Sequence, residues 1–163
     1  MFTGHFEKDK TRKTRKVKKQ GGRTVIRELR LEDYEQLLAL WHKSGIKPNI
    51  NGRESPEALE RQLQAMGPFM LVAENSGDLV GVILGSHDGY EGFLDRVAVA
   101  PEYRKRGVAR RLIIEAERRL EDKGIRKTVV VVEADGKESI GVFKKMGFEI
   151  SEHVVYMVKR RNR

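Results

Sequence analysis

Residues 95–109 read DRVAVAPEYRKRGVA, a stretch in which an alternating apolar run ends at a proline and a helix begins after a glycine. The run before Pro101 predicts a strand that ends there, because proline cannot continue a strand ladder. The residues after Gly107 predict a helix whose first backbone N–H groups have no partner within the helix. Glycine lets a ligand approach this backbone, and the helix dipole adds positive charge. The stretch therefore predicts a strand, a basic loop and a helix that bind an anion such as pyrophosphate.

The same stretch also fits a simpler interpretation, a tight strand-to-helix turn whose basic face contacts only solvent. A Walker phosphate loop is excluded, because Gly107 is not followed by lysine and then serine or threonine. The glycine fingerprint of a Rossmann dinucleotide site is also missing. Five basic side chains surround the predicted anion site and favour a phosphate-bearing ligand: Arg104, Lys105, Arg106, Arg110 and Arg111.

The patterns on either side of this stretch predict alternating strands and helices. Alternating or β-branched apolar runs predict strands at 24–29, 69–74, 79–86, 93–99, 127–133 and 148–158. Apolar residues at helical spacing predict helices at 31–43, from Ser55-Pro56 to Met66, at 107–123 and at 137–146. The order β-α-α-β-β-β-α-β-α-β predicts an α/β fold whose sheet has both antiparallel and parallel neighbours.

Charge divides the chain into a tail and a nearly neutral body. The net charge is +9, and residues 1–24 contribute +7 of it through nine basic and two acidic side chains. Because this segment has few apolar residues, we predict a disordered basic tail at 1–23 and one domain at 24–163. Three interpretations of this tail stay open. It is a solvated extension with no role, it makes weak phosphate contacts to RNA or the ribosome, or it results from a mis-chosen start site.

Composition excludes several classes of protein. The chain of 163 residues has no cysteine, which excludes disulfides, thiolate zinc sites and a cysteine nucleophile. No apolar run approaches the roughly 20 residues of a membrane span. No apolar segment follows the N-terminal basic residues, as it would in a secretory signal. We therefore expect a cytoplasmic protein that makes no membrane contact.

Two motifs, in this order, resemble those of the GCN5-related N-acetyltransferase (GNAT) family. Arg104-x-x-Gly107-x-Ala109 resembles the family's acetyl-CoA motif, Gln/Arg-x-x-Gly-x-Gly/Ala. Further along, residues 142–148 (VFKKMGF) resemble the second motif, Leu/Phe-Tyr-x-x-x-Gly-Phe. The resemblance covers residues 24–158, and the turn at 88–92 is similar to that of the YpeA-like bacterial and archaeal branch.

The resemblance implies a GNAT fold in which the motif strand and its parallel neighbour splay apart. It implies that acetyl-CoA lies in the gap and that an amine attacks the thioester directly, with no metal. A backbone N–H near Val97 would stabilise the oxyanion. A homodimer is the assembly that the resemblance suggests. The implied cofactor-binding residues are Val97, Ala98, Val99, Arg104, Lys105, Arg106, Gly107, Val108, Ala109, Arg110 and Phe143.

The sequence departs from the family pattern at two positions. Many relatives have a tyrosine where this chain has Phe143, and that tyrosine protonates the departing thiolate. Many also have an asparagine where this chain has Gly136. Because a thiol pKa of about 8.5 makes thiolate a tolerable leaving group, transfer can proceed without this acid. Strict alternation places Asp95 on the same face as Val97, which makes Asp95 the candidate general base. The alternative is a structural or exposed carboxylate, and Glu74 is a second candidate base.

Three functions remain open on the sequence. The first is an acetyl-CoA-dependent N-acetyltransferase that acts on a primary amine. The second is a GNAT-fold module that binds acyl-CoA without efficient catalysis, which Phe143 and Gly136 would suit. The third is an accessory domain that contacts RNA or the ribosome through its basic tail. The acceptor site would be shaped by the first two helices and the loop at 46–55.

Overall fold

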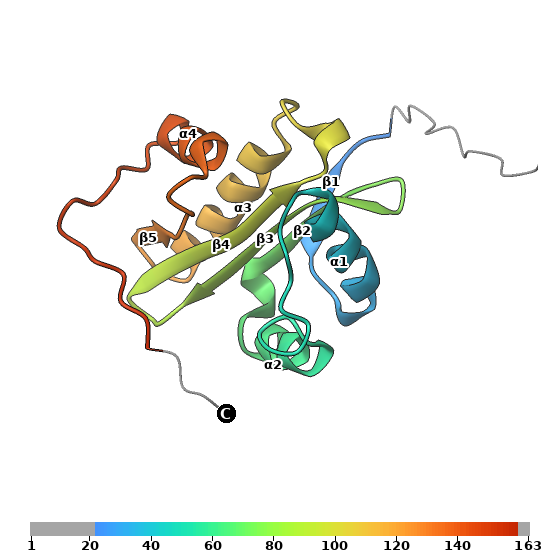
Figure 1. Ribbon diagram of the computed structural model, residues 1–163, viewed down its shortest axis with the longest axis horizontal. Helices are drawn as coiled ribbons and strands as arrows, with labels where there is room; N and C mark the ends of the chain where they lie inside the picture. The colour runs from blue at the N-terminus through green and yellow to red at the C-terminus, as the bar shows by residue number, and fades with distance from the viewer. Residues whose placement is uncertain (1–21, 160–163) are drawn as a thin grey trace, which may run out of the picture.

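Five strands form one mixed sheet in the computed structural model, which describes residues 22–159 (Figure 1). The strands are β1 (Val25–Glu28), β2 (Met70–Asn75), β3 (Asp78–His87), β4 (Glu91–Val99) and β5 (Lys127–Val130). They follow chain order across the sheet and are antiparallel from β1 to β4, whereas β4 and β5 are parallel. A parallel pair needs a long crossover, which a helix supplies here. The predicted α/β fold with a mixed sheet is confirmed.

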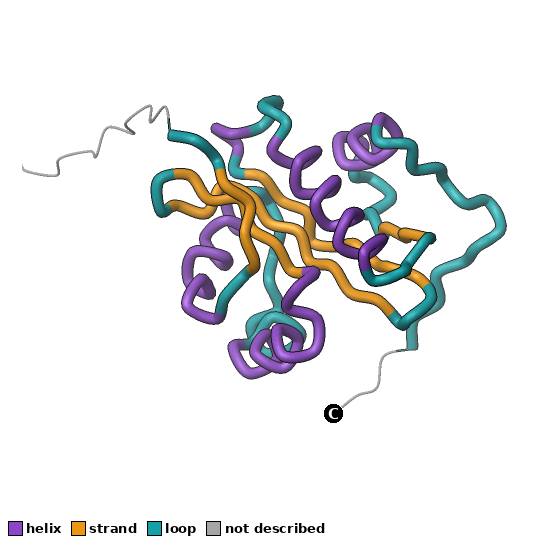
Figure 2. The backbone as a smooth tube through the Cα atoms, turned by 180° about the vertical axis from the view of Figure 1, so that it is seen from behind, coloured by secondary structure: helices purple, strands orange, loops and turns teal. Residues whose placement is uncertain are grey.

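Four helices cover the two faces of the sheet (Figure 2). They are α1 (Tyr34–Lys43), α2 (Pro56–Met66), α3 (Val108–Asp122) and α4 (Lys137–Lys145), with 3-10 turns at Leu31–Asp33, Gly67–Phe69 and Pro101–Tyr103. Ser55 caps α2 as predicted, because its side chain accepts the Ala58 N–H at 3.2 Å. Within residues 22–159, no helix has the length and apolar character needed to cross a membrane.

The core consists of two clusters, one on each face of the sheet. The cluster under α3 contains Leu71, Ile83, Leu94, Leu112, Ile113, Leu120 and the α4 residue Phe143. The cluster under α1 and α2 contains Leu37, Trp41, Leu59, Val72, Val82, Leu84 and Ala98. Both faces of β3 and β4 are therefore covered. Because both faces are covered, a ligand would bind where strand pairing stops rather than on a face of the sheet.

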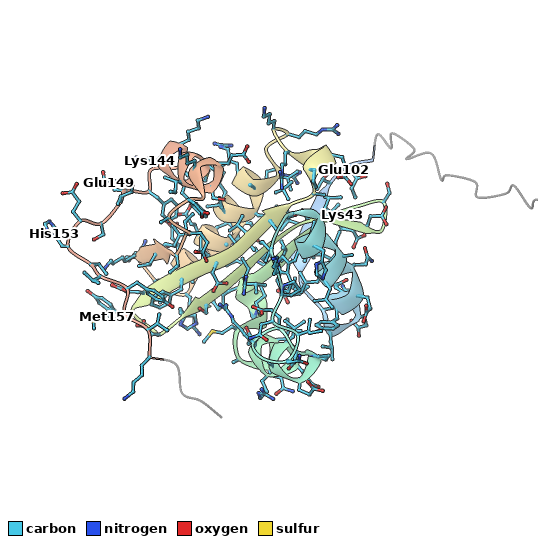
Figure 3. All side chains as sticks on the ribbon, in the orientation of Figure 1. Lys43, Glu102, Lys144, Glu149, His153 and Met157 are labelled. Carbon is cyan, nitrogen blue, oxygen red and sulfur yellow. The ribbon has the colours of Figure 1, made fainter. Side chains whose placement is uncertain are left out.

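The C-terminal segment differs from the prediction. A strand was expected at 148–158, but residues 149–158 contain none, and their apolar side chains from Val154 to Met157 are 73–86% exposed. Figure 3 shows His153 on this segment, away from the sheet, and Met157 farther along it. A β-branched run becomes a strand only where an edge pairs with it, and β5 does not pair with this segment. β5 itself ends at Val130 instead of residue 133. The predicted tail, up to residue 21, lies outside the described residues.

An ion pair fixes β1 to the start of α1. Asp33, 6% exposed, accepts from both Nη atoms of Arg27 (2.7 and 2.8 Å) and from the Arg30 N–H (2.9 Å). Burial alone would raise the pKa of the Asp33 carboxyl, but these hydrogen bonds outweigh burial and hold the pKa below its usual value. A depressed pKa adds stability that is present above the unfolded pKa and is lost as pH falls through the folded pKa.

Replacing Asp33 by asparagine should therefore lower the free energy of unfolding at neutral pH by about 2 kcal/mol. The loss should begin to shrink at about pH 4, where the carboxyl of the unfolded chain becomes protonated, and should disappear below the lowered pKa of the folded carboxyl. Urea unfolding at neutral and acidic pH measures both values, and Glu32→Gln, at an exposed neighbouring residue, is the control. An equal loss of unfolding free energy at both pH values would show that the effect comes from packing instead of charge.

Candidate functional site

The parallel strands β4 and β5 separate at Leu94. Their pairing runs from Glu91 opposite Lys127 to Leu94 opposite Val130, and there β5 ends while β4 continues to Val99. Over residues 95–99, the β4 edge on that side has no strand partner among the described residues. The N–H and C=O groups of such an edge are available to pair with an extended ligand. The predicted splay between the two parallel strands is confirmed.

A β-bulge interrupts β4 at the point of separation. Val82 lies opposite Ala98 and Leu84 opposite Asp95, so three steps along β4 match two steps along β3. Arg96 has a φ of +51°, which is uncommon for a long side chain and identifies it as the bulged residue. The bulge therefore places a strained backbone where the two strands begin to diverge.

The bulge corrects the prediction that Asp95 and Val97 share a face. Cross-strand partners point the same way, and Asp95 lies opposite Leu84, which belongs to the cluster under α1 and α2. Val97 packs against the cluster under α3. Strict alternation fails here because one extra residue changes the face of every residue beyond it. Asp95 thus lies on the α1–α2 side of the strand.

Asp95 has one paired and one unpaired carboxylate oxygen. Its Oδ2 accepts from Arg53 Nη2 at 2.5 Å. Its Oδ1 is buried and has no hydrogen-bond partner among the described residues. Buried polar atoms nearly always have a partner, so an unpaired one indicates where water or a ligand would complete the set. Arg53 belongs to the loop between α1 and α2, and the Asp95 carboxylate therefore joins β4 to this loop.

The same loop supplies a buried ion pair that the sequence analysis missed. Glu54 is 3% exposed, and its Oε1 accepts from Arg96 Nη2 at 2.7 Å. Its Oε2 accepts the Asn49 N–H at 2.8 Å. Adjacent residues 53 and 54 carry charges opposite to those of adjacent residues 95 and 96, and this complementarity was the one available signal. No pattern in one sequence identifies such distant segments as neighbours.

A small pocket, too tight to hold a water molecule, adjoins these charged groups on the α1–α2 side. The Trp41 Nε1–H is buried there without a partner among the described residues. Burial raises the pKa of the Tyr34 hydroxyl, which stays protonated and donates to the Glu54 carbonyl at 2.8 Å. The pocket is lined by Tyr34, Trp41, Arg53, Glu54, Leu59, Gln62 and Leu84. An unpaired donor and the unpaired Asp95 acceptor thus lie on the same side of the sheet.

The open edge of β4 presents the backbone of Val97 and Val99. The Ala100 N–H donates to the Val80 carbonyl of β3 at 2.9 Å, and alternate residues face opposite edges. Ala98 therefore faces β3, and its side chain is buried under α1 and α2, so its predicted place in the cofactor gap is not supported. The Val99 carbonyl accepts from Ser44 Oγ and Arg104 Nε, each at 3.2 Å. The N–H groups of Val97 and Val99 are thus the donors directed toward the gap.

Helix α3 begins at a glycine in the left-handed region. Gly107 is its N-cap with φ +76°, no side chain caps the helix, and a Cβ at this glycine would meet nothing within 4 Å. Exposed backbone N–H groups with no Cβ in front of them fit the oxygens of a pyrophosphate. Val108 is buried and Ala109 half-buried, so these two would offer a ligand only their backbone groups. The side chains of Arg104, Lys105, Arg106 and Arg110 are exposed around this end.

Two contacts refine the predicted basic cluster. The Arg106 guanidinium lies over the Tyr103 ring at 5.5 Å, a cation–π contact that fixes its direction. Arg111 donates to the Thr24 carbonyl at 2.8 Å and so joins α3 to the start of β1. Figure 3 shows Lys43 of α1 and Glu102 close together at the end of β4, where their charged groups are 4.0 Å apart. Arg111 thus has a structural contact, as does Arg104, which donates to the Val99 carbonyl.

The remaining residues named in the sequence analysis make the following contacts in the structure. Phe143 is 5% exposed and packs edge-to-face on Phe148, with ring centroids 5.2 Å apart. Gly136 is the N-cap of α4. Glu74 lies on β2, two strands from β4, and pairs with Arg27 at 2.7 Å, so the structure does not bring this second candidate base to the site.

Comparisons with known proteins agree with this geometry. The family model described as "Acetyltransferase (GNAT) family" matches residues 25–148. Acetyltransferase SG1711 of Sodalis glossinidius (strain morsitans) is 33% identical over 135 residues, which cover 83% of this chain and 94% of that relative. The structure of PaiA N-acetyltransferase from Thermoplasma acidophilum in complex with coenzyme A has a TM-score of 0.72 and 24% identity, over 81% of this chain and 93% of that one. AAC(6')-Iy in complex with the bisubstrate analog CoA-S-monomethyl-acetylneamine has a TM-score of 0.68 and 25% identity, over 85% and 99%.

Proposed function

The chain belongs to the GNAT family of acetyltransferases, whose co-substrate is acetyl-CoA, and we propose that it transfers the acetyl group directly to a primary amine. One observation carries the proposal. β4 leaves β5 at a bulge and then leads, through a basic loop, into a helix capped by Gly107. An extended pantetheine and a pyrophosphate need these two features next to each other.

The proposal assigns the cofactor-binding groups as follows. Backbone N–H groups after Gly107 and the side chains of Arg104, Lys105, Arg106 and Arg110 would hold the pyrophosphate. Backbone groups of Val97 and Val99 would hold the pantetheine as an added strand. When bound, acetyl-CoA supplies an activated thioester. The Val97 N–H would stabilise the negative charge that develops on the thioester oxygen.

The acceptor amine would approach from the α1–α2 side, where Asp95 lies. Its buried, unpaired Oδ1 is an acceptor for a proton on the attacking nitrogen. Arg53 holds the other oxygen and so fixes the direction of the carboxylate. Asp95 thus remains the proposed general base, on the opposite face from the one first predicted.

Replacing Asp95 by asparagine should lower kcat/KM for the amine about 100-fold, because the isosteric amide cannot take up the proton. The Kd for acetyl-CoA should change by less than about threefold, since the carboxylate lies on the other side of the strand from Val97. Steady-state kinetics and calorimetry measure the two values. Asp122→Asn, at the exposed end of α3, is the control. Unchanged kcat/KM in Asp95→Asn would show that another group or solvent is the base.

A second function is a module that binds acyl-CoA without efficient catalysis. Two observations favour it: a phenylalanine at 143, where many relatives have an acidic hydroxyl, and the glycine at 136. Release of free CoA from acetyl-CoA, measured across a panel of primary amines, separates the two functions. Binding of acetyl-CoA without CoA release for any amine would support the module and contradict the enzyme.

A further inference from the structure

Two ion pairs of opposite polarity join the α1–α2 loop to the bulge of β4. Arg53 pairs with Asp95 at 2.5 Å, and Glu54 pairs with Arg96 at 2.7 Å. The loop residues carry the charges + and −, and the strand residues opposite them carry − and +. Exchanging the partners, or shifting the loop by one residue, would place like charges together. We call these four residues the loop clamp.

Backbone and side-chain hydrogen bonds of Arg53 and Glu54 hold the loop half of the clamp in place. The Glu54 carbonyl accepts from the Tyr34 hydroxyl of α1, and the Arg53 carbonyl accepts from Gln62 Nε2 of α2, both at 2.8 Å. The second carboxylate oxygen of Glu54 accepts the Asn49 N–H of its own loop. Residues 53 and 54 are therefore fixed to α1, α2, the loop and β4 together.

The strand half of the clamp is the strained part of β4. A residue with positive φ and a long side chain persists only where its surroundings hold it there. The Arg96 side chain donates to the buried carboxylate of Glu54. A charged carboxylate is stable in a buried position only when it is paired, so the two side chains hold each other in place. The residue that follows is Val97, whose N–H faces the gap between β4 and β5.

We infer that Glu54 is a positioning residue that acts through Arg96. It holds the bulge in the conformation that directs the Val97 N–H into the gap, and it keeps the α1–α2 loop in register with that N–H. The same contacts thereby fix the Val97 N–H on the cofactor side and the α1–α2 loop on the acceptor side. The inference rests on the proposed function for its catalytic consequence, but the clamp itself can be tested on the free protein.

The test begins with Glu54→Gln, which keeps the shape and removes the charge. Amide exchange of residues 95–98 and 49–54 in the free protein should become about tenfold faster. The value of kcat should fall about 10- to 100-fold, because a small displacement of the oxyanion donor is costly. The KM for acetyl-CoA should stay within about threefold, since the pyrophosphate end is not touched. Glu60→Gln, at an exposed residue of α2, is the matched control and should change none of these values.

Two further variants complete the design. Glu54→Gln combined with Arg96→Gln should be no slower in catalysis than either single variant, because both changes break one unit. If Glu54→Gln does not fold, Glu54→Asp replaces it, and the same directions are expected. Unchanged exchange at 95–98, or faster exchange with unchanged kcat, would overturn the inference. If the wild type acetylates no amine, the proposed function fails, and the exchange measurement alone then decides whether the clamp holds the bulge.

Discussion

Replacing Gly107 by aspartate is expected to weaken acetyl-CoA binding about 100-fold without unfolding the protein. A carboxylate at this position would lie beside the proposed pyrophosphate, and two like charges about 5 Å apart near a protein surface repel by about 3 kcal/mol. The fold should survive because a Cβ at Gly107 meets nothing within 4 Å. Aspartate also tolerates a φ of +76° better than most residues and is a good N-cap. Calorimetry with acetyl-CoA measures the Kd.

The matched control is Gly107→Asn, which has the same shape and the same tolerance of positive φ but no charge. It should weaken binding about tenfold or less, through its bulk and its capping of the free N–H groups. If the two variants bind acetyl-CoA with equal affinity, charge repulsion at residue 107 does not explain the weaker binding. Wild-type affinity in a folded Gly107→Asp protein would show that the pyrophosphate binds elsewhere.

The second large effect is expected at Phe143. Replacing it by alanine should lower the free energy of unfolding by about 4 kcal/mol, because it empties the space between α4, Phe148 and the cluster under α3. For a chain of this size, that corresponds to a fall in Tm of about 10 °C. Acetyl-CoA binding should weaken as well, since α4 loses its buried anchor. Thermal unfolding and calorimetry measure the two effects.

Phe143→Tyr separates packing from proton transfer. It adds one hydroxyl, and acetyl-CoA affinity should stay within about threefold of wild type. Turnover should rise or stay unchanged, because the thiolate can leave without a side-chain acid at this position. If the wild type is inactive toward every amine and Phe143→Tyr is active, the acid is required and this account of the chemistry is wrong.

Local patterns in the sequence predicted most of the fold. Ser55-Pro56 at the start of α2, Gly107 at the start of α3 and the alternating run of β4 are each set by residues that are neighbours in sequence. The resemblance to the GNAT family then predicted the splayed parallel pair. These elements are confirmed because their causes, capping and hydrophobic periodicity, act over a few residues.

Two features could not be predicted, and both depend on contacts between residues far apart in the sequence. The bulge at Arg96 is held by Glu54, which lies 42 residues away, so alternation alone placed Asp95 on the wrong face. The run at 154–158 has the composition of a strand but pairs with no edge in the structure.

The central claim is that this chain moves an acetyl group from acetyl-CoA to a primary amine. The most direct measurement is mass spectrometry of a library of primary amines and peptides after incubation with acetyl-CoA, with and without the protein. The account predicts that at least one primary amine gains an acetyl group only in the presence of the protein, with one CoA released for each group transferred. Tight binding of acetyl-CoA, together with no acetylated product anywhere in the library, would contradict it.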